Sequence, residues 1–157
     1  MSTAPEALRL AEAWSRPDPV GTPALAAEFE RLFVGPGPVP CPPYESYWRD
    51  DAPFLLRGSL MGPCTAALVD LYARVGMQLA PACAELPDHV AVELEALAVA
   101  LADPSGRDVA AALLGEHLAS WLPAFCSAVE RETVEEHYRS LAVTTRAWVA
   151  AATRGEG

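Results

Sequence analysis

The stretch LPDHVAVELEALAVALA, residues 86–102, decides the fold class, because its apolar side chains recur at the spacing of an α-helix. The apolar stripe is formed by Val90, Leu94, Leu97 and Leu101. Asp-Pro-Ser-Gly follows at 103–106, and this composition breaks helices. We therefore predict a helix that opens within Leu-Pro-Asp-His at 86–89 and ends near Ala102.

Helical spacing recurs on both sides of this stretch. Upstream, Thr22 followed by Pro23 is the pattern of a helix N-cap, and Gly76 is a natural helix stop. Downstream, Thr133 with Glu136 forms the pattern of a capping box for the last helix. The predicted helices begin near residues 6, 22, 60, 86, 107 and 133.

Few features disturb this helical pattern. Pro123 lies within the fifth segment, where a proline is expected to kink or restart a helix. His117 and Trp121 are one turn apart and are interpreted as core packing. In the third helix the side chains predicted to face inward are Met61, Cys64, Leu68, Leu71 and Val75. The sequence thus predicts an all-α fold, a single domain over 1–157 built as a compact bundle of about five to six helices, with a frayed tail at 153–157.

The composition excludes several classes of function. The net charge is −10 and the pI is near 4.6, whereas a nucleic-acid-binding protein needs a basic surface. The first residues lack the basic and apolar regions of a signal peptide. No apolar run approaches the roughly 18 residues that a membrane helix needs. We therefore expect a cytoplasmic protein without nucleic acid and without direct membrane insertion.

The segment 35–48, GPGPVPCPPYESYW, is the most unusual part of the chain. Five prolines in fourteen residues are expected to exclude a helix and to favour a stiff, extended loop. Linkers rarely carry large aromatic rings such as Tyr44, Tyr47 and Trp48. The loop is therefore predicted to pack onto the body of the domain.

The residues suited to catalysis or metal binding are few. The sequence contains no lysine, which excludes a Schiff-base lysine and a phosphate-loop lysine. The four cysteines lie far apart in the sequence and far from the histidines, so we expect free thiols and no metal site. One enzymatic candidate is His89, a general base beside Asp88 and four residues before Glu93.

Two other interpretations of this turn stay open. Asp88 can cap the helix while His89 makes a local hydrogen bond, or the turn can present its polar groups on a binding surface. Since no nucleophile stands near His89, no catalytic residue is predicted.

Four groups of residues, taken in order, resemble one family. They are EFERLF at 28–33 with Pro-Gly at 36–37 and PPYES at 42–46; Leu-Met-Gly at 60–62 with Tyr72 and Gly76; ELPDH at 85–89 with Glu-Leu-Glu at 93–95; and His-Leu at 117–118 with Trp121 and Pro123. Their order and spacing resemble the TorD/DmsD chaperones, and Pro-Asp-His is shared with the related NarJ-type branch. The resemblance spans residues 28–148.

The resemblance implies an all-helical, non-enzymatic, cytoplasmic chaperone without a cofactor of its own. Such a chaperone binds a molybdopterin oxidoreductase of the dimethyl-sulfoxide-reductase type, through its twin-arginine signal peptide or its apo catalytic subunit, until the client's cofactor is inserted. The peptide-binding positions that carry over are Tyr44, Glu45, Ser46, Trp48, Gly62, Pro87, Asp88 and His89. An apolar peptide segment needs an aromatic groove, and its arginines need carboxylates, here Glu45 and Asp88.

The sequence departs from the family at its start. Members usually carry additional helices before the Leu-Phe segment, whereas 27 residues precede Glu28 here, so the resemblance implies a shortened N-terminus. Either the bundle is smaller, or a partner helix completes it, as in a homodimer. Two other functions stay open, namely a small hydrolase or lyase that uses His89 with Asp88 or Glu93, and an accessory subunit that remains in a redox complex.

Overall fold

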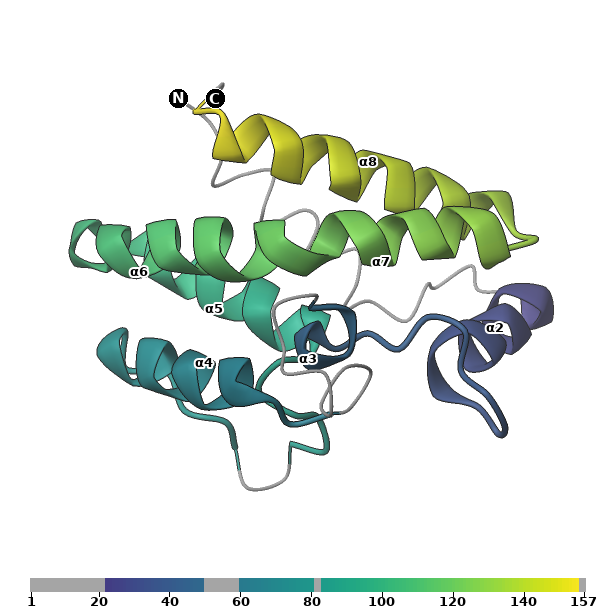
Figure 1. Cartoon of the computed structure of the whole chain (residues 1–157), viewed down its shortest axis with the longest axis horizontal. Coiled ribbons are helices and arrows are strands. Elements are labelled where there is room, and N and C mark those ends of the chain that lie inside the picture. The colour runs from purple at the N-terminus through teal and green to yellow at the C-terminus, as the bar shows by residue number, and fades with distance from the viewer. Residues whose placement is uncertain (1–21, 50–59, 81–82, 156–157) are drawn as a thin grey trace.

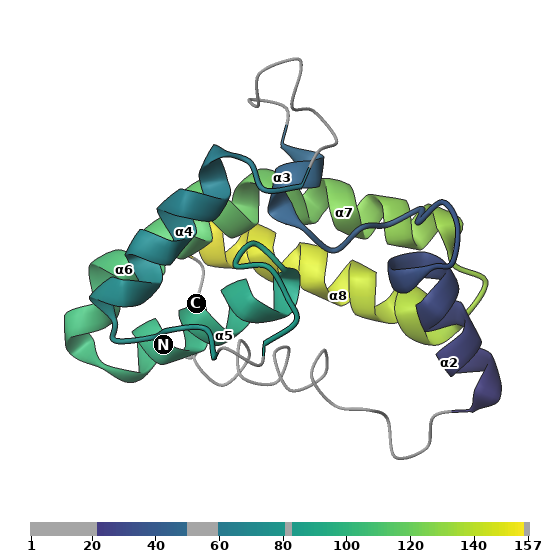
Figure 2. The same ribbon diagram turned by 90° about the horizontal axis from the view of Figure 1, so that it is seen from below.

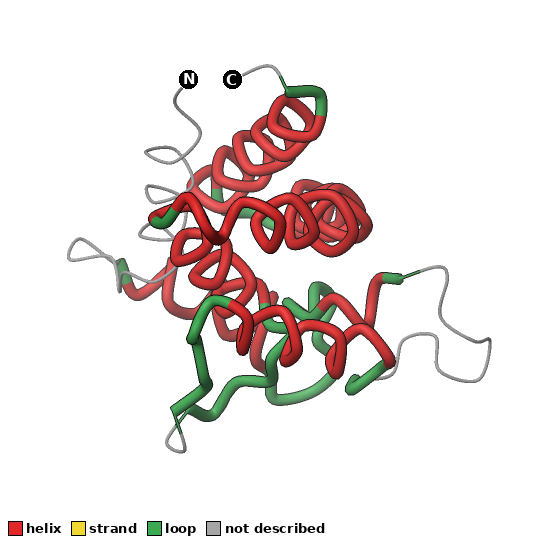
Figure 3. Tube along the Cα trace, turned by 90° about the vertical axis from the view of Figure 1, so that its left-hand side faces the viewer, coloured by secondary structure: helices red, strands yellow, loops and turns green. Residues whose placement is uncertain are grey.

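The apolar stretch at 86–102 forms helix α5 (Val90–Ala102) in the computed structural model, which describes residues 22–49, 60–80 and 83–155. Every regular element within these ranges is a helix, and loops join the helices (Figure 3). The prediction of an all-α fold is confirmed. The helix predicted to begin near residue 6 and the last two residues of the tail lie outside the described ranges.

The helices stack in tiers. Figure 1 shows α8 (Glu136–Thr153) at the top, antiparallel to α7 (Ala119–Glu132), with α5 and α4 (Pro63–Arg74) below them. The pair α7 and α8 forms the most extensive contact between elements of the described chain. Seen from below, α2 (Pro23–Phe29) lies at the opposite end of the molecule from α4 and α6 (Arg107–Ala112) (Figure 2).

A long helical rod occupies the middle tier. It contains, in order, the 3₁₀ turn η3 (Pro104–Gly106), α6, the π-helical turn η4 (Leu113–Leu118) and α7. The prediction was that Pro123 kinks or restarts the helix; a restart is wrong, because α7 continues through this residue, and a kink stays a prediction. A proline removes one backbone hydrogen bond, and the fully buried Trp121 and Phe125 pack this segment into the core on either side of it.

The rod also corrects an expectation from the sequence. Residues 104–132 are long and apolar enough to cross a membrane, by length and composition. Half of the most apolar window is buried inside the molecule, as in the core helix of a globular protein. On its own, this rod is therefore only weak support for a membrane span.

Helix α2 begins as the sequence predicts. Thr22 is the N-cap, its hydroxyl accepts a hydrogen bond from the Leu25 N–H at 3.3 Å, and Pro23 is the first helical residue. The π-helical turn η1 (Glu30–Val34) extends α2 and ends at Gly35, whose φ of 109° favours glycine.

The predicted capping box at the last helix is wrong. Helix α8 begins at Glu136 with Glu135 as its N-cap, and Thr133 instead terminates α7. The Thr133 hydroxyl donates a hydrogen bond to the buried Glu28 carboxylate at 2.9 Å. A contact between residues so far apart in sequence has displaced the local cap, and it joins α2 to the turn between α7 and α8.

The proline-rich segment packs onto the domain as predicted, with Cys41 and Glu45 fully buried. Its last four residues form the short helix α3 (Glu45–Trp48), which corrects the prediction that the whole segment 35–48 lacks helix. The prolines end at Pro43, so the backbone N–H groups and torsions that a helix needs are available from Tyr44 onward.

Apolar side chains from every tier meet in one core. The largest fully buried side chains include Trp121, Tyr72 and Phe125, which come from α7 and α4. Leu68 of the predicted third helix lies in this core, but Met61 is 68% exposed. Helix α4 begins at Pro63, two residues after Met61, so helical spacing does not govern the direction of the Met61 side chain.

Candidate functional site

The aromatic loop and the start of α5 lie side by side. The Val90 N–H donates to the Pro43 carbonyl at 2.9 Å, and the Glu45 N–H donates to the Asp88 carbonyl at 2.9 Å. These two bonds form an isolated antiparallel bridge in which Tyr44 faces His89. The rings of Tyr44 and His89 meet edge to face, with centroids 5.1 Å apart. Two motifs more than forty residues apart in the sequence therefore form one structural unit.

His89, and not Asp88, caps helix α5. Its Nδ1 accepts the Ala91 N–H at 3.1 Å, so the ring hydrogen of neutral His89 lies on Nε2. Burial lowers the pKa of His89, against the opposing effect of the carboxylates of Glu85 and Asp88. The interpretation that Asp88 caps the helix is wrong, because His89 is the N-cap and α5 begins at Val90.

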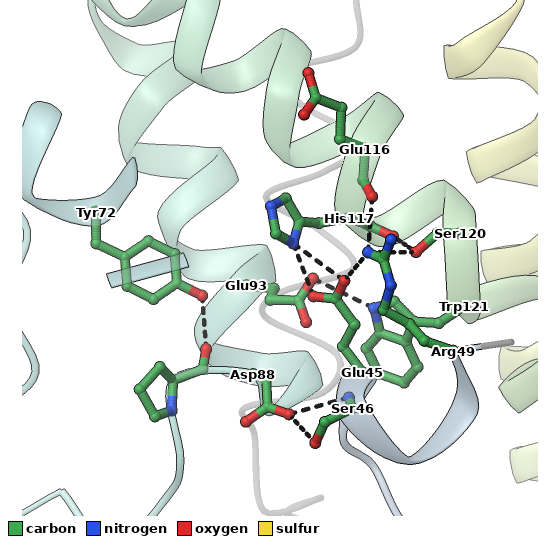
Figure 4. A network of polar contacts seen from close by, with 11 residues as sticks. Glu45, Ser46, Arg49, Tyr72, Asp88, Glu93, Glu116, His117, Ser120 and Trp121 are labelled. Carbon is green, nitrogen blue, oxygen red and sulfur yellow. Dashed lines mark hydrogen bonds and ion pairs between the residues drawn. The ribbon is translucent and has the colours of Figure 1, made fainter. Parts of the chain in front are cut away.

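Asp88 fastens α3 to the start of α5. Its side chain is fully buried, and Oδ2 accepts hydrogen bonds from the Ser46 N–H at 3.1 Å and the Ser46 hydroxyl at 2.5 Å. In Figure 4 this pair lies at the edge of a larger group of polar side chains. A buried carboxylate with such partners holds its neighbours in place and does not reach the surface.

Glu45 is the centre of that polar group. Its buried carboxylate faces Nδ1 of His117 at 2.8 Å and Nη1 of Arg49 at 2.5 Å (Figure 4). Arg49 also donates to the Glu116 carbonyl at 3.1 Å, which ties α3 to the rod. A buried carboxylate paired with two cationic or polar partners is the arrangement that compensates for its lost hydration.

Glu93 lies beside Glu45 inside the molecule. Trp121 donates its indole N–H to Glu93 Oε2 at 3.3 Å, and no hydrogen-bond partner for Oε1 is found among the described residues. Burial above all, and then the Glu45 carboxylate, raise the pKa of Glu93 well above its usual value. Among the described residues, Asp88 is hydrogen-bonded to Ser46, Glu93 to Trp121 and His89 to the Ala91 N–H, and neither carboxylate is hydrogen-bonded to His89.

The remaining predicted site residues support this unit. Tyr72 donates its hydroxyl hydrogen to the Pro87 carbonyl at 2.6 Å, and Trp48 donates its indole N–H to the Pro42 carbonyl at 2.6 Å. A Cβ atom on Gly62 would lie 3.3 Å from the Cβ of Ser46. Gly62 therefore permits the close approach of α3 to the start of α4.

A pocket of about 500 Å³ opens beside the Tyr44–His89 bridge. One wall comes from α2 and η1, another from the proline-rich loop, and a third from residues 85–91. Its lining is Phe29, Phe33, Val34, Val39, Pro42, Pro43, Tyr44, Tyr47, Leu60, Glu85, His89, Val90 and Ala91. Nearly all of these side chains are apolar or aromatic, and Glu85 is the one acidic group among the described lining residues. An apolar pocket with few polar groups suits an apolar ligand held in one orientation.

Of the predicted peptide-binding residues, only Tyr44 and His89 line this pocket. Glu45, Ser46 and Asp88 are buried and do not line the pocket. The Ser46–Asp88 hydrogen bonds join α3 to the start of α5, and the Glu45–His117 contact joins α3 to the rod. Their assignment as peptide contacts stays a prediction.

Glu85, Phe29 and Phe33 belong to the family motifs, but none of the three was predicted to bind a peptide. Phe29 and Phe33 are four residues apart, a spacing that marks one helix face but does not distinguish a closed core from an open pocket. For Glu85 the available signal was its position four residues before His89. The Glu45–His117 contact had no signal in the sequence, since 72 residues separate its partners.

Metal chemistry finds no support in the described ranges, where no group of three His, Cys, Asp or Glu side chains could hold an ion. All four cysteines are free thiols. Burial raises the pKa of Cys41 to about 11 and that of Cys126 to about 12, so these thiols stay protonated and unreactive.

Comparisons with known proteins agree with one another. Residues 2–127 match the family model described as nitrate reductase delta subunit. The chain is 30% identical over 123 residues to the Tat proofreading chaperone DmsD of Salmonella typhi, a match that covers 78% of this chain and 57% of that protein. The chain thus spans little more than half the length of this curated relative.

The fold is also similar to a solved structure. A crystal structure assigned as a redox enzyme maturation protein from Archaeoglobus fulgidus superposes with a TM-score of 0.62 at 28% sequence identity. The match covers 94% of this chain and 82% of that one. The similarity therefore extends over nearly the whole chain and is not limited to one motif.

Proposed function

Because the chain belongs to the nitrate reductase delta subunit family, we propose that it is a chaperone for the maturation of a molybdopterin oxidoreductase. The resemblance to TorD/DmsD chaperones predicted from the motifs is confirmed by this membership and by the two relatives. The client in this proposal is the apo catalytic subunit or its twin-arginine signal peptide, which the chaperone holds until the client's cofactor is inserted.

The observation that carries the proposal is the apolar pocket beside the Tyr44–His89 bridge. The central region of a signal peptide is an apolar segment, which adopts a helix in a groove of this kind. Phe29, Phe33 and Val34 offer it an apolar wall, with Val34 56% exposed. Burying such a segment contributes roughly 25 cal/mol for each Å² of apolar surface removed from water.

In this proposal the predicted site residues have two different roles. Tyr44 and His89 contact the client, because they line the pocket. The others build the pocket from behind, through the Asp88–Ser46 bonds, the Glu45–Arg49 pair and the close approach at Gly62. Substituting one of the second group alters binding indirectly, by releasing the loop that carries Tyr44.

A binding role fits the site better than catalysis. The relatives carry chaperone and maturation names. In the described residues His89 uses Nδ1 to cap α5, and the nearest carboxylate to its Nε2 is Glu85 at 3.8 Å. An enzyme that used His89 with Asp88 or Glu93 would lose turnover, but not ligand binding, in the His89→Ala variant.

A chaperone and an accessory subunit differ in where they act and in whether they stay with the mature enzyme. A chaperone that acts before export works in the cytoplasm and leaves the mature enzyme, whereas an accessory subunit stays with it. Co-purification with cofactor-loaded enzyme would therefore favour the accessory role. The homodimer stays a prediction, which sedimentation equilibrium of the full chain checks.

The pocket is tested by titration calorimetry with a synthetic twin-arginine signal peptide. Val34→Arg places a long cation in the apolar wall and is expected to weaken binding by about tenfold or more, equivalent to about 1.4 kcal/mol. Val143→Arg makes the same change at an exposed position on α8 that does not line the pocket, and should bind as the unaltered protein does. Equal affinity of both variants would place the peptide elsewhere.

A further inference from the structure

The carboxylates near the pocket differ in their access to a ligand. Glu45, Asp88 and Glu93 are fully buried. Glu85 lines the pocket, and its side chain is 45% exposed. A cationic side chain of a bound segment can therefore reach Glu85 without any rearrangement, whereas the other three carboxylates lie behind the pocket wall.

Among the described residues, the side chains that contact Glu85 do not compensate its charge. The Tyr44 hydroxyl donates to Glu85 Oε2 at 2.9 Å, and burial followed by this carboxylate raises the pKa of Tyr44 to about 12, so Tyr44 is a neutral donor. His89 turns its Nε2 toward the same oxygen at 3.8 Å. Because burial lowers the pKa of His89, the ring does not supply a positive charge at neutral pH. No described residue donates a hydrogen bond to Oε1.

We propose that Glu85 binds an arginine side chain of the client segment whose apolar part fills the pocket. The inference rests on the proposed function and identifies Glu85 as the residue that favours a positively charged segment at that site. A guanidinium presents two parallel N–H donors that match the two oxygens of a carboxylate. Tyr44 holds Oε2 in place, and Oε1 faces no competing donor of the described chain.

The apolar lining and Glu85 together favour a peptide segment that is both apolar and cationic. Phe29, Phe33 and Val34 need an apolar partner, while Glu85 belongs to the part of the lining that residues 85–91 form. A segment that satisfies both has its arginine directly beside an apolar run. A purely apolar peptide leaves the Glu85 carboxylate partly desolvated without a cationic partner from the peptide, and that costs binding free energy. The net charge of −10 favours the approach of such a cationic segment.

A double-mutant cycle across the interface tests this contact. The probe is a synthetic peptide with two adjacent arginines followed by a run of leucine and alanine. A second peptide of the same sequence has both arginines replaced by the neutral isostere citrulline. Calorimetry measures both peptides against the full-length protein and its Glu85→Gln variant. Glutamine keeps an oxygen that accepts the Tyr44 hydroxyl hydrogen, so the pocket wall is retained.

We expect Glu85→Gln to weaken binding of the arginine peptide by about tenfold, as charge pairs at interfaces do, and to leave the citrulline peptide unchanged. The matched control is Glu95→Gln, which removes one exposed carboxylate of α5 that does not line the pocket. It should bind both peptides as the unaltered protein does.

Three other results would contradict the proposed Glu85–arginine contact. If Glu85→Gln binds both peptides normally, Glu85 is not the arginine partner, although signal-peptide binding still stands. If Glu95→Gln causes the same loss, the effect is one of overall charge. If the unaltered protein binds neither peptide, the proposed function fails together with this inference.

Discussion

Single carboxylates have opposite roles in this molecule according to what surrounds them. Glu28 is buried at the turn between α7 and α8, where it accepts hydrogen bonds from Arg31 at 2.8 and 2.9 Å, from Thr133 at 2.9 Å and from the Val134 N–H at 2.9 Å. Chiefly through Arg31, and against the effect of burial, these contacts lower the pKa of Glu28 to about 2. Its ionised form therefore stabilises the fold.

Glu28→Gln should consequently destabilise the protein by about 2 kcal/mol near neutral pH. Since the folded pKa lies below the usual 4.5, the contribution of Glu28 is complete above about pH 4.5 and is lost as the pH falls toward about 2. Urea unfolding at a series of pH values should show the two proteins converging across this window. Glu95→Gln serves as the exposed control, and a constant difference at every pH would contradict the assignment.

Glu93 shows the reverse behaviour. Its folded pKa is raised, so the folded chain keeps a proton that the unfolded chain releases above about pH 4.5. Stability is therefore lost as the pH rises from about 4.5 through the folded pKa. Glu93→Gln removes this cost while its amide still offers an oxygen to the Trp121 N–H.

We expect Glu93→Gln to be more stable than the unaltered protein, with a gain that grows between about pH 5 and about pH 8. Urea unfolding at both pH values measures the gain. A variant that is less stable at the higher pH would mean that Glu93 is ionised in the fold and that its charge stabilises the fold.

At the scale of elements, the site depends on how closely α3 approaches the start of α4. Ser46 of α3 is held by Asp88 on one side and faces Gly62 on the other. A side chain at position 62 would press on the Ser46 Cβ at 3.3 Å. The contact is tight on both sides, so α3 has little freedom to move away.

Gly62→Ala should destabilise the protein by about 1–2 kcal/mol, because an added methyl group in a tight contact forces the backbone to shift. It should also weaken peptide binding, since α3 follows directly on Tyr44. Gly115→Ala is the matched control, because a Cβ at that exposed helical position meets no atom within 4 Å and alanine favours the helix. Thermal unfolding measures both, and equal melting temperatures for the two variants would contradict the account.

At two positions tertiary contacts outweigh the local conformational preference of a residue. Thr133 is a good N-cap by sequence, but its hydroxyl is used by Glu28. Pro123 is a poor helix residue, but it lies in α7 among buried side chains. In both cases one local preference of about 1 kcal/mol, or a few for proline, competes with several tertiary contacts that outweigh it.

At the scale of the whole molecule, the charge of −10 acts on association and not on the fold. Raising the ionic strength from about 0.01 M to about 0.15 M shortens the Debye length from about 30 Å to about 8 Å. The association rate of an arginine-bearing peptide should then fall by about tenfold, while its dissociation rate changes little.

Stopped-flow measurements of both rates check this expectation, and the citrulline peptide is the control that should show little dependence on salt. If the whole effect of salt appeared in the dissociation rate, long-range attraction would not be what brings the peptide to the pocket.

The sequence by itself determined the class of fold, most of the helices, the Thr22 cap and the family. Helical spacing and caps depend on residues within a turn or two of one another, and the family motifs are short segments in a set order. The stripe at 86–102 therefore predicted α5 without any knowledge of its neighbours.

Only the tertiary structure decided which polar side chains are buried and which are open to a ligand. Glu45, Glu85 and Asp88 look alike in sequence, yet Glu45 and Asp88 are fully buried and Glu85 is 45% exposed. Exposure depends on the pairing of residues 43–45 with 88–90 and on the rod behind them, which are contacts between distant segments. A local sequence pattern does not show which carboxylate is buried. The same side chain forms internal hydrogen bonds when other segments cover it and is open to a ligand when they do not.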